Sequence, residues 1–249
     1  MSGIFETMRA HNKKIVYLNE HIKRITSAAK AIKIKNPHSL LRLKKMIQTA
    51  LRNTRFKDVY IKLTLLKSSI AARLTLEVKK YQPLTAQKYR EGFSGLVSNF
   101  WKDECNALSG IKTTERLLYE LSFHEAKARG FDEAIILNSR GLLAEGSKTN
   151  VFFVKDKVLF TPSLKCGCLN GITRMAVSDL AKKHKIKIKE GNFTIYDLFD
   201  ADEAFVTNSL IGIMPLKKVN KIRIGRGAGS MTQLLRKKYC ELLYAAKKN

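Results

Sequence analysis

Three short segments in the middle of the chain combine an amine, a carboxylate and a helix start. They are Ser109–Leu117, Ala144–Asn150 and Cys168–Arg174. The first contains Lys112, whose amine can attack a carbonyl carbon. The second contains Glu145, and a carboxylate at a strand end can hold a proton on a ring nitrogen. The third starts a helix, where free N–H groups bind phosphate. Together they suit an aldehyde cofactor with a ring nitrogen and a phosphate.

Each of these residues also has an ordinary explanation. Lys112 is expected at a helix start, where the helix dipole disfavours the charged ammonium. A pKa lowered in this way would make the amine more reactive, yet most lysines at helix starts are surface residues. An isolated Glu145 more commonly faces solvent. Gly171-Ile172-Thr173, like the second donor cluster Thr207-Asn208-Ser209, is a common capping pattern. The residues alone therefore leave both a cofactor site and a set of surface and capping residues open.

The elements that must position these residues alternate between strands and helices. Apolar periodicity predicts an α/β (α+β) fold. The helices are expected at 20–34 (after an Asn19 cap), 39–53, 112–130, 171–184, 196–199 and 231–246. The strands are expected at 3–10, 15–18, 59–66, 72–78, once within 81–100, and at 133–138, 142–145, 151–154, 158–160, 186–188, 204–207 and 211–216. The stretch 101–110 is interpreted as a loop between domains 1–104 and 105–249.

Composition limits the function classes. The 249 residues are 45% hydrophobic, which is enough for a large core. No apolar run reaches the roughly 20 residues of a membrane helix, and no secretory signal precedes the first strand, so we expect a cytoplasmic protein without a membrane partner. The four cysteines do not have the spacing of a metal site, so no metal is expected. Gly225–Gly229 has G-x-G-x-G spacing and is interpreted as a loop, not a dinucleotide fingerprint.

The net charge of +26 has two interpretations. Clustered cations would indicate nucleic-acid binding, because they displace counterions from phosphates. Here the basic residues are spread along the chain without interleaved aromatics, which favours a lysine-rich solvated surface. Nucleic acid is therefore not the expected partner, although a basic nucleic-acid-binding protein stays as the non-enzyme alternative. The same charge would steer a small anionic metabolite towards the protein.

Six motifs, in this order, resemble a known family. They are G-I-F-E-T-M-R (3–9), H-I-K-R (21–24), K-T-T-E-R-L (112–117), A-E-G-S-K-T-N-V-F (144–152), G-C-L-N-G-I-T-R (167–174) and F-V-T-N-S-L-I-G-I-M-P (205–215). The chain resembles the class IV aminotransferase-like enzymes of fold type IV, which use pyridoxal 5′-phosphate. That resemblance implies a small N-terminal α/β domain, a larger barrel-like C-terminal α/β domain and a homodimer. Family chains begin about two dozen residues earlier, so the family's first strands are not expected here.

The resemblance also assigns roles to residues. Lys112 would be the Schiff-base lysine and would transfer protons. Glu145 would bind the pyridine nitrogen and Leu169 would pack on the ring. The phosphate would be bound by the residues Arg24, Gly171, Ile172, Thr173, Asn208 and Ser209. Arg9, in the F-E-T-M-R motif, would contact a substrate carboxylate.

The reaction is predicted from the residues after the lysine. Branched-chain aminotransferases usually carry a tyrosine five residues after it, where this chain has Leu117. The arrangement K-x-x-x-R-L, with Arg116, looks more like 4-amino-4-deoxychorismate lyase, as does N-S-L-I-G-I-M-P (208–215). That enzyme makes 4-aminobenzoate and pyruvate in folate biosynthesis. We therefore expect this lyase first. The alternative is an aminotransferase acting on branched-chain or D-amino acids.

Overall fold

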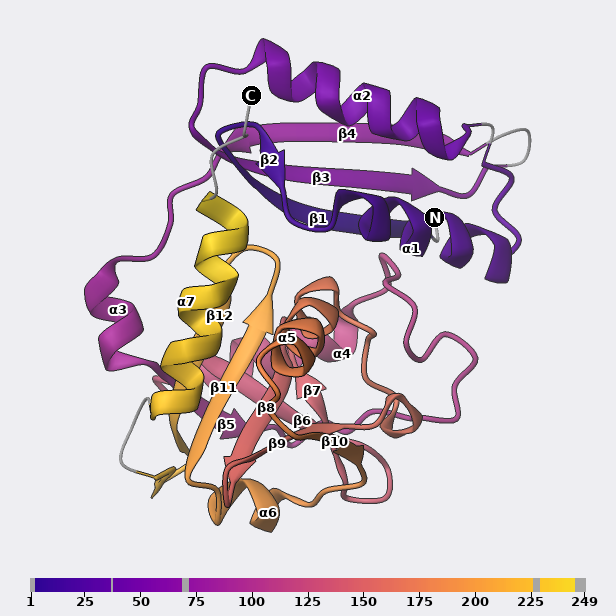
Figure 1. The fold of residues 1–249 in the computed structure, drawn as a ribbon. Coiled ribbons are helices and arrows are strands. Elements are labelled where there is room, and N and C mark those ends of the chain that lie inside the picture. The colour runs from indigo at the N-terminus through magenta and orange to yellow at the C-terminus, as the bar shows by residue number, and fades with distance from the viewer. Residues whose placement is uncertain (1–2, 37, 69–71, 226–228, 245–249) are drawn as a thin grey trace. The chain divides into compact units, whose positions relative to one another are not determined.

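The computed structural model describes residues 3–36, 38–68, 72–225 and 229–244, which fold into two compact units (Figure 1). The first unit comprises residues 1–83, 111–115 and 240–249, and the second comprises residues 84–110 and 116–239. This division differs from the boundary expected at residue 104. Lys112 also belongs to the first unit, because residues 111–115 pair with its sheet, as described below.

The first unit contains an antiparallel sheet with the strand order β2-β1-β3-β4. The strands are β1 (Gly3–His11), β2 (Lys14–Ile15), β3 (Asp58–Leu66) and β4 (Arg73–Lys80). The expected second strand at 15–18 is much shorter, because the chain turns into a helix at Tyr17. Residues 111–115 extend this sheet beside β1: Thr113 pairs with Ile4, and the Phe5 N–H donates to the Lys112 carbonyl at 3.0 Å.

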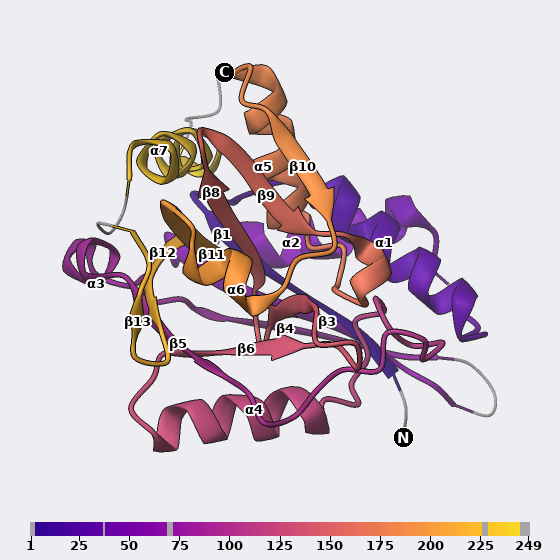
Figure 2. The same cartoon turned by 90° about the horizontal axis from the view of Figure 1, so that it is seen from below.

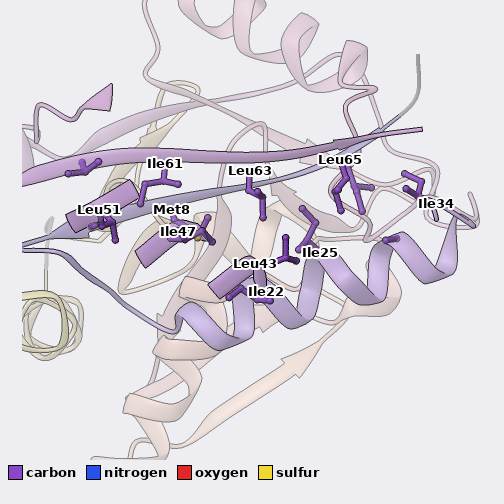
Figure 3. Packing of buried hydrophobic residues seen from close by; sticks show 14 residues of the cluster. Met8, Ile22, Ile25, Ile34, Leu43, Ile47, Leu51, Ile61, Leu63 and Leu65 are labelled. Carbon is purple, nitrogen blue, oxygen red and sulfur yellow. The ribbon is translucent and has the colours of Figure 1, made fainter. Parts of the chain in front are cut away.

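Two helices, α1 (Leu18–Ala31) and α2 (Leu40–Asn53), cover one face of this sheet. Their apolar stripes pack on the inward-facing residues of β1 and β3, as Figure 3 shows for Ile25 and Leu63. Helix α2 begins as predicted, with Ser39 Oγ accepting the Arg42 N–H. The predicted Asn19 cap is wrong, because the turn before α1 is made by Tyr17 in the left-handed region (φ 55°).

The second unit contains a curved nine-stranded sheet with the order β10-β9-β8-β11-β12-β5-β6-β7, to which β13 adds beside β12. The strands are β5 (Phe93–Val97), β6 (Glu133–Leu137), β7 (Leu143–Gly146), β8 (Asn150–Lys155), β9 (Val158–Pro162), β10 (Ile188–Gly191), β11 (Glu203–Asn208), β12 (Gly212–Val219) and β13 (Ile222–Arg223). The sheet curls until its ends meet, since the Leu143 N–H at the start of β7 donates to the Phe193 carbonyl beyond β10 at 2.7 Å. This closure agrees with the expected barrel-like α/β domain.

The remaining helices are α3 (Ala86–Glu91), α4 (Leu117–Ala128), the short 3₁₀ helix η1 (Leu164–Cys166), α5 (Ile172–Lys183), α6 (Ile195–Phe199) and α7 (Ser230–Tyr244). Helix α4 lies along β6 (Figure 2) and begins at Leu117, not at Lys112 as expected. Leu117, at the first position of this helix, is 74% exposed, while Ser122 is buried. The interpreted loop at Gly225–Gly229 falls largely on residues 226–228, outside the described residues. No helix among the described residues has the length and apolar content to cross a membrane.

Candidate active site

Lys112 lies in the segment 111–115, which pairs with β1 in the first unit. Its Nζ is 4.6 Å from the centroid of the Phe5 ring, and its carbonyl accepts the Phe5 N–H. The backbone here is held by the bridge to β1, and the Thr113 N–H donates to the Ile111 carbonyl at 3.0 Å across Lys112, so this residue is not in a helix. The helix-dipole argument for a reactive amine is therefore wrong, and sheet pairing, not a helix start, positions the residue.

Arg24 is bound to a buried carboxylate in the same unit. Its Nε and Nη2 donate to the two oxygens of Glu6 at 2.6 and 2.7 Å, and His21 Nδ1 lies 2.6 Å from Glu6 Oε2. Burial alone would raise the pKa of Glu6, but Arg24 and His21 outweigh it and lower that pKa to about 2. Burial lowers the pKa of His21. Glu6 therefore holds Arg24 as a rigid cation, which suits a guanidinium that binds phosphate.

Arg9, the predicted substrate contact, points into a separate cluster of the first unit. Its Nη2 donates to Asp58 at 2.7 Å and to the Tyr244 hydroxyl at 3.1 Å, and its guanidinium lies 4.9 Å from the centroid of the Tyr81 ring. The residue is only 5% exposed. These contacts favour a structural role, in which Arg9 ties β1 to β3 and to the end of α7.

In the second unit, Glu145 is 4% exposed at the end of β7. Its Oε1 accepts Lys102 Nζ at 2.5 Å and the Tyr119 hydroxyl at 2.9 Å, while its Oε2 accepts the Leu169 N–H at 3.0 Å. Burial alone would lower the pKa of Lys102, but attraction to Glu145 outweighs it and raises that pKa. Burial and the carboxylate raise the pKa of Tyr119 to about 12, so the phenol keeps its proton. Glu145 is a fixed carboxylate, not the solvent-facing one that its sequence context also allowed.

The turn that follows Glu145 is organised by a second buried carboxylate. Glu133, on β6, accepts the Ser147 N–H at 3.1 Å, the Thr149 hydroxyl at 3.0 Å and the Ser147 hydroxyl. Burial raises the pKa of Glu133. A carboxyl group with this many donors is expected to fix the backbone path of residues 146–149, and hence the end of β7.

Helix α5 begins at Ile172 with Gly171 as its N-cap, within one residue of the predicted start. Its first turn is buried at Ile172 and Thr173, and among the described residues no side chain caps it. A Cβ on Gly171 would overlap Asn150 Oδ1, and Asn150 Nδ2 donates to the Leu169 carbonyl at 2.8 Å. Asn150 therefore links the residue that donates to Glu145 with the start of α5. Uncapped, buried N–H groups at a helix start fit a phosphate.

The second donor cluster lies next to this helix start. Thr207, on β11, is the register partner of Asn150, and its buried hydroxyl has no hydrogen-bond partner among the described residues. The Asn208 side chain is bound to backbone groups: its Oδ1 accepts the Leu210 and Ile211 N–H groups of its own turn, and its Nδ2 donates to the Lys148 carbonyl. Ser209 follows β11 in that turn. An unpartnered buried hydroxyl beside an uncapped helix start fits the phosphate of the expected cofactor.

Several residues that complete these arrangements were missed by the sequence analysis: Glu6, Lys102, Tyr119, Glu133 and Asn150. Two of them gave a signal, because Glu6 and Glu133 are carboxylates within apolar strand patterns, and a buried carboxylate needs donors. Asn150 lies within the quoted motif 144–152 but was given no role, and Lys102 and Tyr119 sit in loop and helical sequence where nothing distinguishes them. Only the fold brings them to the predicted residues.

The residues that pointed to the lyase have structural roles. Arg116 Nη2 donates to the Ser147 carbonyl at 3.0 Å, and its guanidinium lies 4.8 Å from the centroid of the Tyr119 ring. The Leu117 side chain is exposed. Neither side chain is therefore a sound basis for choosing a reaction.

Comparison with known proteins corrects the predicted reaction. A branched-chain-amino-acid aminotransferase of Pseudomonas aeruginosa is 29% identical over 258 residues, covering 97% of this chain and 84% of the relative. A D-alanine aminotransferase of Listeria monocytogenes is 29% identical over 253 residues, covering 96% and 86%. A solved 4-amino-4-deoxychorismate lyase-like protein of Legionella pneumophila has a TM-score of 0.87 but 24% identity, which shows a shared fold alone. The expectation of a lyase in folate biosynthesis is wrong.

The structural match extends over nearly the whole chain. A T.th. branched-chain amino acid aminotransferase, solved with pyridoxamine 5′-phosphate, has a TM-score of 0.91 at 26% identity, and the match covers 96% of this chain and 84% of that one. This confirms the predicted fold type IV. The family model described as amino-transferase class IV matches residues 3–219, so the chain belongs to the class IV aminotransferase family.

Proposed function

We propose that this protein is an aminotransferase that moves the amino group of a branched-chain amino acid to a 2-oxo acid. The observation that carries the proposal is the match to the family model over residues 3–219, in a chain that also has Lys112 and a buried, hydrogen-bonded Glu145. The cofactor of this class IV enzyme is pyridoxal 5′-phosphate. When bound, it supplies an aldehyde that takes up the amino group and a ring that accepts electrons.

The residues of the first unit bind the cofactor covalently and by charge. We assign two roles to the Lys112 amine: it would bind the aldehyde carbon of the cofactor, and it would transfer the substrate proton. Arg24, held by Glu6 as a fixed cation, is assigned to the phosphate. Since Phe5 borders Lys112 Nζ, an apolar ring lies beside the amine.

The residues of the second unit orient the cofactor. Glu145 is assigned to the ring nitrogen, and Leu169, whose N–H contacts that carboxylate, to the ring face. The N–H groups of Ile172 and Thr173 at the start of α5 are assigned to the phosphate, together with Ser209 and the unpartnered Thr207 hydroxyl. Asn208 would act through the backbone of its turn.

D-amino acids are the second candidate substrates. The observation that favours them is the 29% identity to a D-alanine aminotransferase, equal to that of the branched-chain relative. The substrate is a small molecule in either case. The proposal includes a homodimer, which light scattering tests by a mass of twice 28.3 kDa.

Borohydride trapping tests the cofactor assignment. Protein incubated with pyridoxal phosphate should turn yellow, and reduction should attach the cofactor to the peptide that contains Lys112. Lys112→Ala should abolish trapping. The matched control is Lys62→Ala, since Lys62 Nζ lies 5.0 Å from the centroid of the same Phe5 ring but is assigned no role. Trapping on another lysine, or unchanged trapping in Lys112→Ala, contradicts the assignment.

Substrate assays test the reaction. Leucine with 2-oxoglutarate should yield glutamate, and D-alanine with 2-oxoglutarate should yield D-glutamate and pyruvate if the second candidate is right. The rates of the two reactions separate the candidates. A protein that binds the cofactor and transfers no amino group from either donor contradicts the proposal.

A further inference from the structure

The Glu145 carboxylate is bound unequally at its two oxygens. An ionised carboxylate has about four acceptor positions, two on each oxygen. Lys102 Nζ and the Tyr119 hydroxyl fill both positions on Oε1, at 2.5 and 2.9 Å. Among the described residues, Oε2 accepts only the Leu169 N–H, at 3.0 Å. One acceptor position is therefore left, and it lies on Oε2.

Lys102 is buried, although most lysines of a highly charged protein are expected on its surface. The side chains of Lys102 and Glu145 are 7% and 5% exposed, so the ion pair is almost fully withdrawn from water. Its Nζ also donates to the Tyr119 hydroxyl at 2.6 Å, so the phenol accepts from Lys102 and donates to Glu145. A buried pair is no better for stability than well-packed apolar residues, so its presence calls for a role beyond folding.

We propose that Lys102 and Tyr119 are positioning residues, which hold Glu145 through Oε1 and reserve Oε2 for the ring nitrogen of the cofactor. The inference rests on the proposed function, because it assumes that Glu145 meets that nitrogen. Lys102 also balances the charge of Glu145. The ring nitrogen then holds its proton less strongly than it would beside an uncompensated buried carboxylate.

Two ligands test this proposal: pyridoxal phosphate and its analogue with carbon in place of the ring nitrogen. In wild-type protein, the ratio of their dissociation constants measures how much the site gains from a protonated ring nitrogen. Lys102→Met leaves Glu145 without its cation, so the preference for pyridoxal phosphate should rise about tenfold or more, equivalent to about one pH unit in the affinity of the nitrogen for its proton. Tyr119→Phe should raise it by a smaller factor.

The same change should be visible on the ring nitrogen itself. With ¹⁵N-labelled cofactor, the pH midpoint of the nitrogen resonance should move upward by about one unit or more in Lys102→Met. The double variant Lys102→Met/Glu145→Gln removes both charges and should lose the raised preference. The double variant leaves no unpaired buried charge, so it can still be measured if Lys102→Met alone does not fold.

Lys88→Met is the matched control, since it breaks another ion pair of the second unit, to Asp132 at 2.8 Å, that does not involve Glu145. It should leave the ligand ratio unchanged. A purely structural Lys102 would weaken both ligands equally and leave the ratio and the midpoint at their wild-type values, which would overturn the inference. If wild-type protein binds neither ligand, the proposed function itself fails.

Discussion

Replacing Glu6 by glutamine should destabilise the first unit in a pH-dependent way. The carboxylate is buried beneath α1 and accepts two hydrogen bonds from Arg24 and one from His21. Glutamine has nearly the same shape but no charge, and its amide can accept from only one oxygen. The guanidinium therefore loses one hydrogen bond and its counter-ion, while the packing around the side chain is kept.

The magnitude follows from the pKa of Glu6. Arg24 and His21 overcome the opposing effect of burial and lower it from 4.5 to about 2, a difference that corresponds to about 3 kcal/mol of stability. Because the pKa is lower in the folded state, this stability is present above about pH 4.5 and is lost as the pH falls towards 2. Linkage predicts that about 2 kcal/mol of it has gone by pH 3.

Urea unfolding of wild-type protein and Glu6→Gln at pH 7, 4 and 3 measures this. The variant should be less stable by about 3 kcal/mol at pH 7, and the difference should shrink to about 1 kcal/mol at pH 3. Burial lowers the pKa of His21 and Glu6 opposes that lowering, so His21 destabilises both proteins as the pH falls below 6.5, and the variant at least as much as wild type. This contribution acts against the narrowing expected at pH 3. Glu77→Gln, at an exposed pair with Lys79, is the control and should change stability by less than about 1 kcal/mol. A difference between wild type and Glu6→Gln that stays constant with pH would refute the reasoning.

Three further changes test the second unit. Thr207→Val removes a buried hydroxyl that has no hydrogen-bond partner among the described residues. It should weaken the binding of pyridoxal phosphate severalfold in a titration and leave the melting temperature unchanged or higher. The control Thr161→Val removes a hydroxyl bound to the Val151 carbonyl, and it should lower stability by about 1 kcal/mol without changing cofactor binding. Gly171→Ala would push a methyl group against Asn150 Oδ1, so cofactor affinity should fall at least tenfold in the same titration; unchanged affinity would mean that the start of α5 does not bind the phosphate. Glu133→Ala removes the acceptor of Ser147 and should speed amide hydrogen exchange at residues 146–149, and unchanged exchange would exclude that role.

The wrong prediction of the reaction has a physical explanation. It was based on Arg116 and Leu117, two neighbours of the lysine whose types differ among branches of the family. The fold uses Arg116 to hold the Ser147 carbonyl and leaves Leu117 in solvent. Substrate choice depends on which side chains surround the substrate, and the spacing of residues along one segment does not encode that.

Local sequence determined much of this protein. Alternating apolar residues predicted β3 and β4, a helical stripe and Ser39 predicted α2, and Gly171 predicted the start of α5. These features depend on backbone preferences and periodicities within a few residues, which a sequence displays directly. The six ordered motifs also indicated the family and its cofactor, because each motif is a short continuous segment that can be recognised without knowing the fold.

Tertiary structure decided how those residues are held. Lys112 is not helical, because its backbone pairs with β1, which precedes it by more than one hundred residues. Arg24 meets Glu6 and Glu145 meets Lys102 across separations of 18 and 43 residues. No local preference encodes such contacts, since they form only when packed strands and helices close the chain between them. The sequence therefore determined which groups could perform the chemistry, and the fold alone decided their partners, their burial and their charge.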